Sequence, residues 1–155
     1  MNKVFRAHIE SLELSLKRLI AMPPVSVEML PTTVPESGVY LFSEGDLHLY
    51  VGRSDGIRRR VQGHCRPASP SNAASFAFRL ARDITGIKTI RHSPDGSRDR
   101  IEKHPEFGPE FTRQKQRIRK MHLRFVSEPD PIRQAILEMY AAVSLNTKHN
   151  SFENH

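Results

Sequence analysis

The sequence predicts an α+β protein, with a small and largely antiparallel sheet of about three strands flanked by helices. Two segments rich in aromatic and branched residues, 37–43 and 47–52, are separated by three residues and predict a β-hairpin. A third segment, 120–126, alternates apolar with polar residues and predicts another strand. Apolar residues at helical spacing before, between and after these segments predict the helices.

The first 30 residues are expected to form a helix and a connector that precede the main domain, residues 31–155. Apolar residues at roughly helical spacing predict a single amphipathic helix over residues 3–21. Pro23 and Pro24 would end this helix, because proline lacks the backbone N–H that a helix needs. The helix could pack on the domain or pair with a second copy of the chain as a homodimer, and the sequence leaves both open.

Between the second and third strands, an insertion over about residues 66–119 separates the elements of the domain. A helix that Ser54 or Asp55 caps is expected to run from the hairpin to about residue 65, and a second from Ser71 to about residue 83. Residues 85–112 are rich in proline and glycine, so we expect an irregular excursion with room for one short helix.

Asp130 and Pro131 predict the start of the last helix, because they supply an N-cap and a proline at the first helical position. The helix is expected to span residues 132–145. Its predicted apolar side carries Ile132, Ala135, Ile136, Met139 and Val143.

The composition excludes several classes of protein. No run of about 18 apolar residues is present, so no membrane span is expected. One cysteine, Cys65, can form neither an internal disulfide nor a cysteine-rich zinc site, and a reducing cytoplasm is the natural compartment. The chain has no GxxxxGK[ST] phosphate loop, which argues against a nucleotide hydrolase.

The formal net charge of +7 is concentrated in two places. Residues 53–66 hold five arginines against one acid, and residues 113–124 hold six basic residues and no acid. Clustered positive charge predicts a polyanionic partner, since each phosphate contact releases condensed counterions. A solvated basic face is the alternative that charge alone leaves open.

Tyr40 and Tyr50 lie on the two strands of the predicted hairpin. If residues 44–46 form a three-residue loop, Tyr40 stands opposite Tyr50 and both rings share one face. A loop of two or four residues would place them on opposite faces. Ordinary cross-strand packing would account for such a pair by itself.

Arg60 and His64 are four residues apart on the helix predicted after the hairpin, so they share one face. A guanidinium there could bridge two phosphate oxygens, and a neighbouring histidine could relay a proton. Arg58 and Arg59 are expected on the solvated face of the same helix.

Residues 38–64 resemble the core of the GIY-YIG nuclease family. Gly38-Val39-Tyr40 matches the first motif of that family, and Tyr50-Val51-Gly52 matches the second. Arg60 and His64 follow the second tyrosine by 10 and 14 residues, the spacing that the family pattern has. The resemblance extends over residues 37–65 and 120–155, and leaves 66–119 unassigned.

The resemblance further implies a metal-binding glutamate on a later helix and an asparagine soon after it. Glu138 is the only acid between residues 132 and 145, and Asn150 fits the asparagine better than Asn146 does. Without the hairpin, an exposed glutamate with no function would be the better interpretation of Glu138.

The activity that the resemblance implies is hydrolysis of DNA phosphodiester bonds with one divalent metal ion, for which Mg²⁺ is expected. Glu138 would hold the metal, Tyr40 would activate water, Tyr50 would position water or phosphate, Arg60 would stabilise charge, and His64 would relay a proton. RNA stays open as a substrate, and a non-catalytic nucleic-acid-binding protein is the rival. The expected contacts to the DNA backbone are Arg53, Arg58, Arg59, Arg113, Lys115, Arg117 and Lys120.

Overall fold

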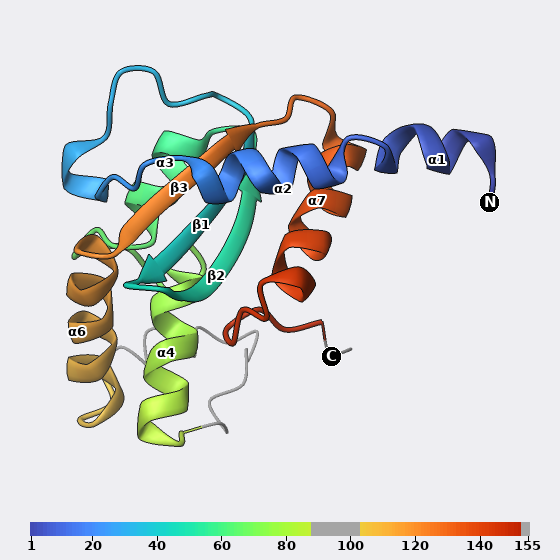
Figure 1. The fold of residues 1–155 in the computed structure, drawn as a ribbon. Coiled ribbons are helices and arrows are strands. Elements are labelled where there is room, and N and C mark those ends of the chain that lie inside the picture. Colours follow the sequence, from blue (N-terminus) through green and yellow to red (C-terminus); the bar gives the residue numbers. More distant parts are fainter. Residues whose placement is uncertain (88–102, 153–155) are drawn as a thin grey trace. The chain divides into compact units, whose positions relative to one another are not determined.

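The computed structural model describes residues 1–87 and 103–152. The chain divides into two compact units, residues 1–59 with 121–155 and residues 60–120. The first unit contains a three-stranded antiparallel sheet with the strand order β2-β1-β3, which confirms the predicted α+β class (Figure 1). Its elements are α1 (Lys3–Ile9), α2 (Leu12–Ala21), η1 (Val27–Met29), β1 (Gly38–Glu44), β2 (Leu47–Ser54), β3 (His122–Ser127) and α7 (Pro131–Ser144).

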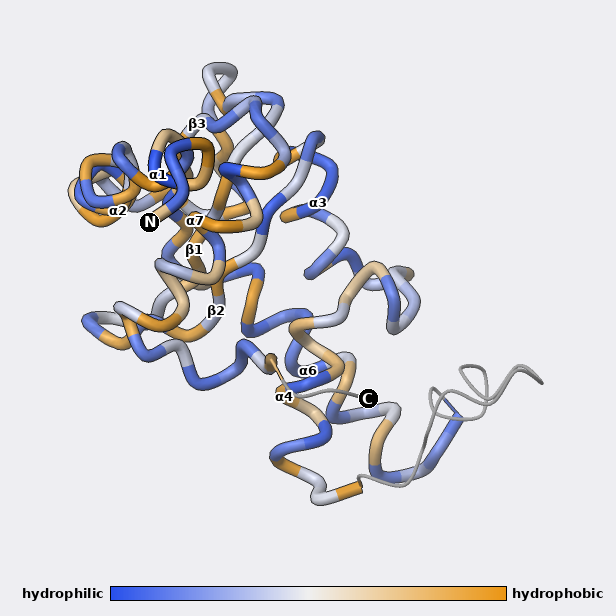
Figure 2. Tube along the Cα trace, turned by 90° about the vertical axis from the view of Figure 1, so that its right-hand side faces the viewer, coloured by the Kyte–Doolittle hydropathy of each residue, from blue (hydrophilic) through white to orange (hydrophobic). Residues whose placement is uncertain are grey.

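The N-terminal segment forms two helices, so the prediction of a single helix over 3–21 is wrong. The helix breaks at Glu10 and Ser11, where no proline or glycine marks the sequence. The two parts differ in packing: α1 buries none of its residues, whereas α2 buries Leu16 and Leu19. Both carry apolar and hydrophilic residues along their length, so hydropathy alone does not locate the break (Figure 2).

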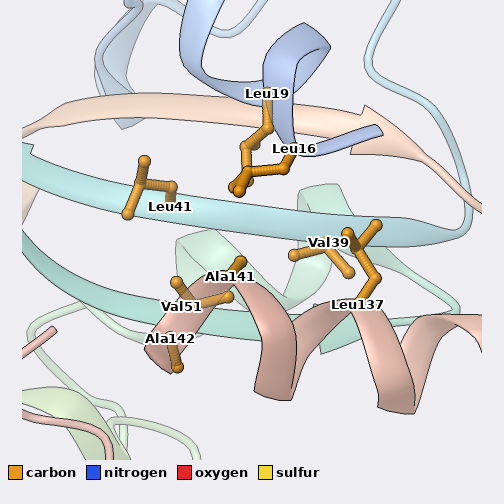
Figure 3. Packing of buried hydrophobic residues seen from close by; sticks show 8 residues of the cluster. All are labelled: Leu16, Leu19, Val39, Leu41, Val51, Leu137, Ala141 and Ala142. Carbon is orange, nitrogen blue, oxygen red and sulfur yellow. The ribbon is translucent and has the colours of Figure 1, made fainter. Parts of the chain in front are cut away.

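The core of the first unit lies between one face of the sheet and helices α2 and α7. Val39 and Leu41 of β1 and Val51 of β2 point to this face, as strand alternation requires. They are buried together with side chains from both helices (Figure 3). The helical members of this cluster are Leu16, Leu19, Leu137, Ala141 and Ala142.

Helix α7 begins where the sequence predicts, since the Asp130 side chain accepts a hydrogen bond from the Arg133 N–H at 2.8 Å and Pro131 follows. Its predicted apolar side, however, is not the buried one. Ile132, Met139 and Val143 are exposed. The helix buries Gln134, Leu137, Ala141 and Ala142 instead. The buried stripe and the exposed stripe both have helical spacing. The exposed stripe carries the larger apolar side chains, so it was the one predicted to be buried.

The second unit contains α4 (Ser75–Thr85) and α6 (Phe107–Arg119), and α3 (Ile57–Gly63) crosses into it from the first unit. Aromatic rings hold α4 and α6 together, with Phe78 lying 5.2 Å from Phe107 and 6.2 Å from Phe111 between ring centroids. The prediction of an irregular excursion over 85–112 missed the start of α6. Its Gly108 and Pro109 read as helix breakers, but they lie in the first turn, where a proline removes no helical hydrogen bond. The remainder of that prediction, residues 88–102, lies outside the described residues.

Within residues 1–87 and 103–152, no helix is both long and apolar enough to cross a membrane.

Candidate functional site

The β1–β2 turn differs from the predicted three-residue loop. Glu44 pairs with Leu47, so the turn has only two central residues, Gly45 and Asp46. Gly45 adopts a φ of 56°, a left-handed conformation that glycine adopts without strain and that tight hairpin turns require. The register then shifts by one residue beyond Ser43, where Leu49 is the extra residue of a β-bulge.

A two-residue turn alone would place Tyr40 and Tyr50 on opposite faces of the sheet. The bulge shifts the register by one residue and so returns them to the same face. Tyr50 pairs with Phe42, and Tyr40 pairs with Gly52, two positions further along. The prediction that Tyr40 stands directly opposite Tyr50 is therefore wrong, yet both side chains point to the same face of the sheet. Their ring centroids lie 6.4 Å apart with the planes tilted by 43°. Both tyrosines are buried, Tyr40 almost completely with 1% exposed.

The two glycines of the tyrosine motifs are required by packing. A Cβ atom on Gly52 would lie 2.3 Å from both Cζ and Oη of Tyr40, so the Tyr40 ring occupies the space above this glycine. A Cβ atom on Gly38 would lie 2.0 Å from the backbone oxygen of Val126 on β3. The first clash is with a ring and the second with backbone. Neither glycine can be replaced without displacing a neighbour.

Glu138, the predicted metal ligand, forms an ion pair with Arg53, a predicted DNA contact. Oε2 of Glu138 accepts a hydrogen bond from Nε of Arg53 at 3.1 Å. The side chains are 28% and 45% exposed, respectively. The pair joins α7 to β2, an edge strand of the sheet. The two positions are 85 apart in the sequence, and no local pattern indicates this pairing.

Helix α7 packs on the sheet face that Val39 and Leu41 occupy, whereas the tyrosine rings point to the other face. Arg53 pairs with Val39, so its side chain lies on the α7 face of the sheet, and Glu138 contacts it there, on the face opposite the tyrosine rings. One turn earlier on α7, Nε2 of Gln134 donates to Oδ1 of Asp55 at 2.9 Å. Sequence patterns did not indicate Gln134 and marked Asp55 only as a possible helix cap, and the two residues extend the same line of contacts just beyond the end of β2.

Asn150 continues this line. Its Oδ1 accepts a hydrogen bond from the Val51 N–H at 2.9 Å, and its Nδ2 donates to the Val51 carbonyl at 2.8 Å. The backbone N–H of His149 donates to the carbonyl of Leu49 at 3.2 Å. Thr147 Oγ1 donates to Asn150 Oδ1 at 2.7 Å and orients the amide. Asn150 therefore holds the backbone after Tyr50 and His149 holds the backbone before it, so the two residues together form a clamp on the edge strand.

Arg60 and His64 lie on and just after α3, in the second unit. The Arg60 guanidinium donates to the carbonyl of Ala73 at 3.2 Å and to Oγ of Ser75 at 3.1 Å. His64 is fully buried, and its ring lies 6.4 Å from that of Phe76, nearly edge on. Burial, aided by the charge of Arg60, lowers the pKa of His64 to about 3. The imidazole is therefore neutral at pH 7 and a weak base.

The basic residues predicted to contact DNA differ in their burial and in their partners within the protein. Lys115 is 5% exposed, and its Nζ donates to the carbonyls of Pro67 at 2.6 Å and Ser69 at 3.1 Å. Arg113 is exposed but pairs with Glu110 at 2.6 Å, and this contact holds the pKa of the Glu110 carboxyl below its usual range. Of the rest, Arg58 donates to the Pro31 carbonyl, Arg117 donates to Gln114, and Arg59 and Lys120 are exposed.

The fit of a divalent cation to Glu138 rests on a single carboxylate. In the described part of the chain, no group of three or more histidine, cysteine, aspartate or glutamate side chains could enclose a metal ion. Mg²⁺ commonly binds through one or two carboxylates while it keeps several waters and contacts substrate phosphate. One partly exposed carboxylate at a sheet edge fits that mode of binding, and it does not fit a closed structural zinc site.

Comparison of the chain with protein-family models, with curated proteins and with solved structures gives no match.

Proposed function

We propose that this protein is a metal-dependent endonuclease that hydrolyses phosphodiester bonds of DNA. The observation that carries the proposal is the placement of chemical groups around β2. Tyr50 lies on this strand with its ring beside that of Tyr40, and Arg53, three residues further on and on the opposite face of the sheet, contacts Glu138. Tyr40, Tyr50 and Glu138 belong to the pattern that resembles the GIY-YIG family, and the net charge of +7 favours a polyanionic substrate.

In this proposal each side chain has a separate task. Glu138 would hold Mg²⁺, which supplies Lewis-acid polarisation of the scissile phosphate when bound. Arg53 would contact the phosphate backbone, because a guanidinium pairs well with phosphate oxygens. Tyr40, deprotonated to the phenolate, would accept a proton from the attacking water and become the phenol, and Tyr50 would orient water or phosphate. Asn150 would position Tyr50 through the neighbouring backbone instead of touching the substrate.

Arg60 and His64 are the remaining residues to which the family resemblance gives a role in the reaction. Arg60 would stabilise negative charge on the phosphate. A histidine with a pKa near 3 is a poor proton acceptor at pH 7, so the burial of His64 favours a role in packing over proton relay.

A cleavage assay tests the proposal. Supercoiled plasmid, duplex and single-stranded oligonucleotides and an RNA oligonucleotide are incubated with the protein in Mg²⁺ or in EDTA. We expect the protein to cleave DNA in Mg²⁺ and not in EDTA. We expect Glu138→Gln to abolish this cleavage. The matched control is Glu36→Gln, which removes the same charge from an exposed side chain elsewhere. Intact substrates with wild type, or cleavage that survives in Glu138→Gln, would refute the proposal.

A DNA-binding protein without catalytic activity is the second candidate. Two observations favour it: the nearly complete burial of Tyr40 and the occupation of the Glu138 carboxylate by Arg53. It predicts that fluorescence anisotropy detects salt-dependent binding to duplex DNA, equal in Mg²⁺ and in EDTA, with no cleavage under either condition.

A further inference from the structure

The contact between Arg53 and Glu138 joins two side chains to which the proposed function gives different ligands. Glu138 is assigned to a divalent cation and Arg53 to a DNA phosphate, yet Arg53 Nε lies 3.1 Å from Glu138 Oε2. A guanidinium at hydrogen-bond distance occupies a lone pair of that oxygen. It also places a positive charge where a cation would approach, and like charges repel.

The pair is suited to exchange its partners. Both side chains are partly exposed, so water and ions reach them. Ion pairs of this exposure contribute little to folding stability, and breaking one therefore costs little. The guanidinium has an alternative partner in phosphate, which accepts two parallel hydrogen bonds from it. The carboxylate has its own alternative in a hard divalent cation.

We propose that Arg53 acts as an internal competitor of the metal ion, which holds Glu138 in the DNA-free protein and releases it when a DNA phosphate takes the guanidinium. Metal and DNA then bind cooperatively, because each removes one partner of the ion pair. The free protein would bind the metal a few-fold more weakly than the DNA-bound protein, so loading would rise when the substrate binds. This inference rests on the proposed function, since that function assigns the two ligands.

The test measures metal binding to the full chain without DNA, with Mn²⁺ as the probe and the decrease of its free electron paramagnetic resonance signal as the readout. Arg53→Gln removes the competitor and keeps a polar side chain. We expect it to bind Mn²⁺ about 1.5- to fivefold more tightly than wild type, the range set by an ion pair of this exposure. Arg133→Gln is the matched control, because it removes the same charge from an exposed position on α7.

Three further outcomes would overturn the inference. Equal Mn²⁺ affinity in wild type and Arg53→Gln would show that Arg53 does not compete, even if the protein cleaves DNA. An equal gain of Mn²⁺ affinity in Arg133→Gln would show that the effect follows from the loss of any positive charge and not from the contact with Glu138. Binding in Arg53→Gln that persists after Glu138→Gln is added would place the metal elsewhere, and would also refute the metal site of the proposed function. If tighter Mn²⁺ binding requires Glu138 but no DNA is cleaved, the competition stands and the nuclease activity fails.

Folding is checked independently. Circular dichroism and urea unfolding of each variant establish that a change in metal affinity does not follow from a change in structure.

Discussion

The side-chain amide of Asn150 pairs with both backbone groups of Val51, accepting from its N–H at 2.9 Å and donating to its carbonyl at 2.8 Å. An amide side chain thereby replaces one residue of a neighbouring strand. Edge strands leave such backbone groups unpaired and open to association with other chains. With the hydrogen bond from His149 to Leu49, the segment after α7 covers part of the outer edge of β2.

Replacement of Asn150 by alanine removes both hydrogen bonds and leaves two partly buried backbone groups of Val51 without this partner. We expect Asn150→Ala to lower the free energy of unfolding by about 1–3 kcal/mol, measured by urea denaturation. Lys148→Ala changes an exposed residue of the same segment and should stay within about 0.5 kcal/mol of wild type. Equal stability of the two variants would contradict the clamp.

Gly52 is expected to tolerate no side chain while Tyr40 is present. Gly52→Ala places a methyl group 2.3 Å from the Tyr40 ring and should cost about 1–3 kcal/mol of stability. Tyr40→Phe removes only the hydroxyl, so the clash with Cζ persists in the double variant. In a Tyr40→Ala background the same glycine substitution should cost much less. Additive effects in that second double-mutant cycle would exclude the contact.

Lys115 is buried and Lys120 is exposed, so replacing them should affect stability differently. Lys115→Ala removes a buried ammonium that contacts two carbonyls and lies 4.3 Å from the centroid of the Phe111 ring, so it should lower stability by about 1–3 kcal/mol. Lys120→Ala should leave stability unchanged. If Lys120 contacts a phosphate, that variant weakens DNA binding at all sequences and reduces the salt slope by about 1. Reversed stabilities would refute the assignment.

His64 should make the protein less stable in weak acid. Its pKa is about 3 in the folded state and about 6.5 when unfolded, so between these values the unfolded chain binds a proton that the folded one does not. The free energy of unfolding is therefore unaffected by His64 above pH 6.5 and falls as the pH drops below it. The contribution amounts to about 2 kcal/mol between pH 7 and pH 5.

Urea unfolding at several pH values measures this effect. His64→Leu should lose that part of the pH dependence, whereas His122→Gln, at an exposed position, should retain it. A pH profile that is the same in His64→Leu and in wild type would contradict the buried neutral imidazole.

Local patterns predicted those parts of the fold that local chemistry determines. Asp130 and Pro131 located the start of α7, because capping involves only neighbouring residues. The first two strands followed from β-branched and aromatic composition, and the third from the alternation of apolar and polar residues. The shared face of Tyr40 and Tyr50 was predicted through a three-residue loop that does not exist. It holds because a two-residue turn and one bulge residue also leave three residues unpaired.

The remaining features depend on contacts between distant segments. The buried side of α7 is set by the sheet beneath it, and helical spacing fitted the exposed stripe of Ile132, Met139 and Val143 equally well. The contacts of Arg53 with Glu138 and of Asn150 with Val51 span 85 and 99 residues. No periodicity within a single sequence reports such pairs.

The glycines of the two tyrosine motifs carry a consequence for how such chains change over time. Gly38 and Gly52 are constrained by a backbone oxygen and by an aromatic ring, whatever the function of the protein. A descendant that lost Glu138 would still need both glycines to pack its sheet. The tyrosine motifs can therefore persist without the proposed activity, and the presence of Glu138 is the better indicator of that activity in a related chain.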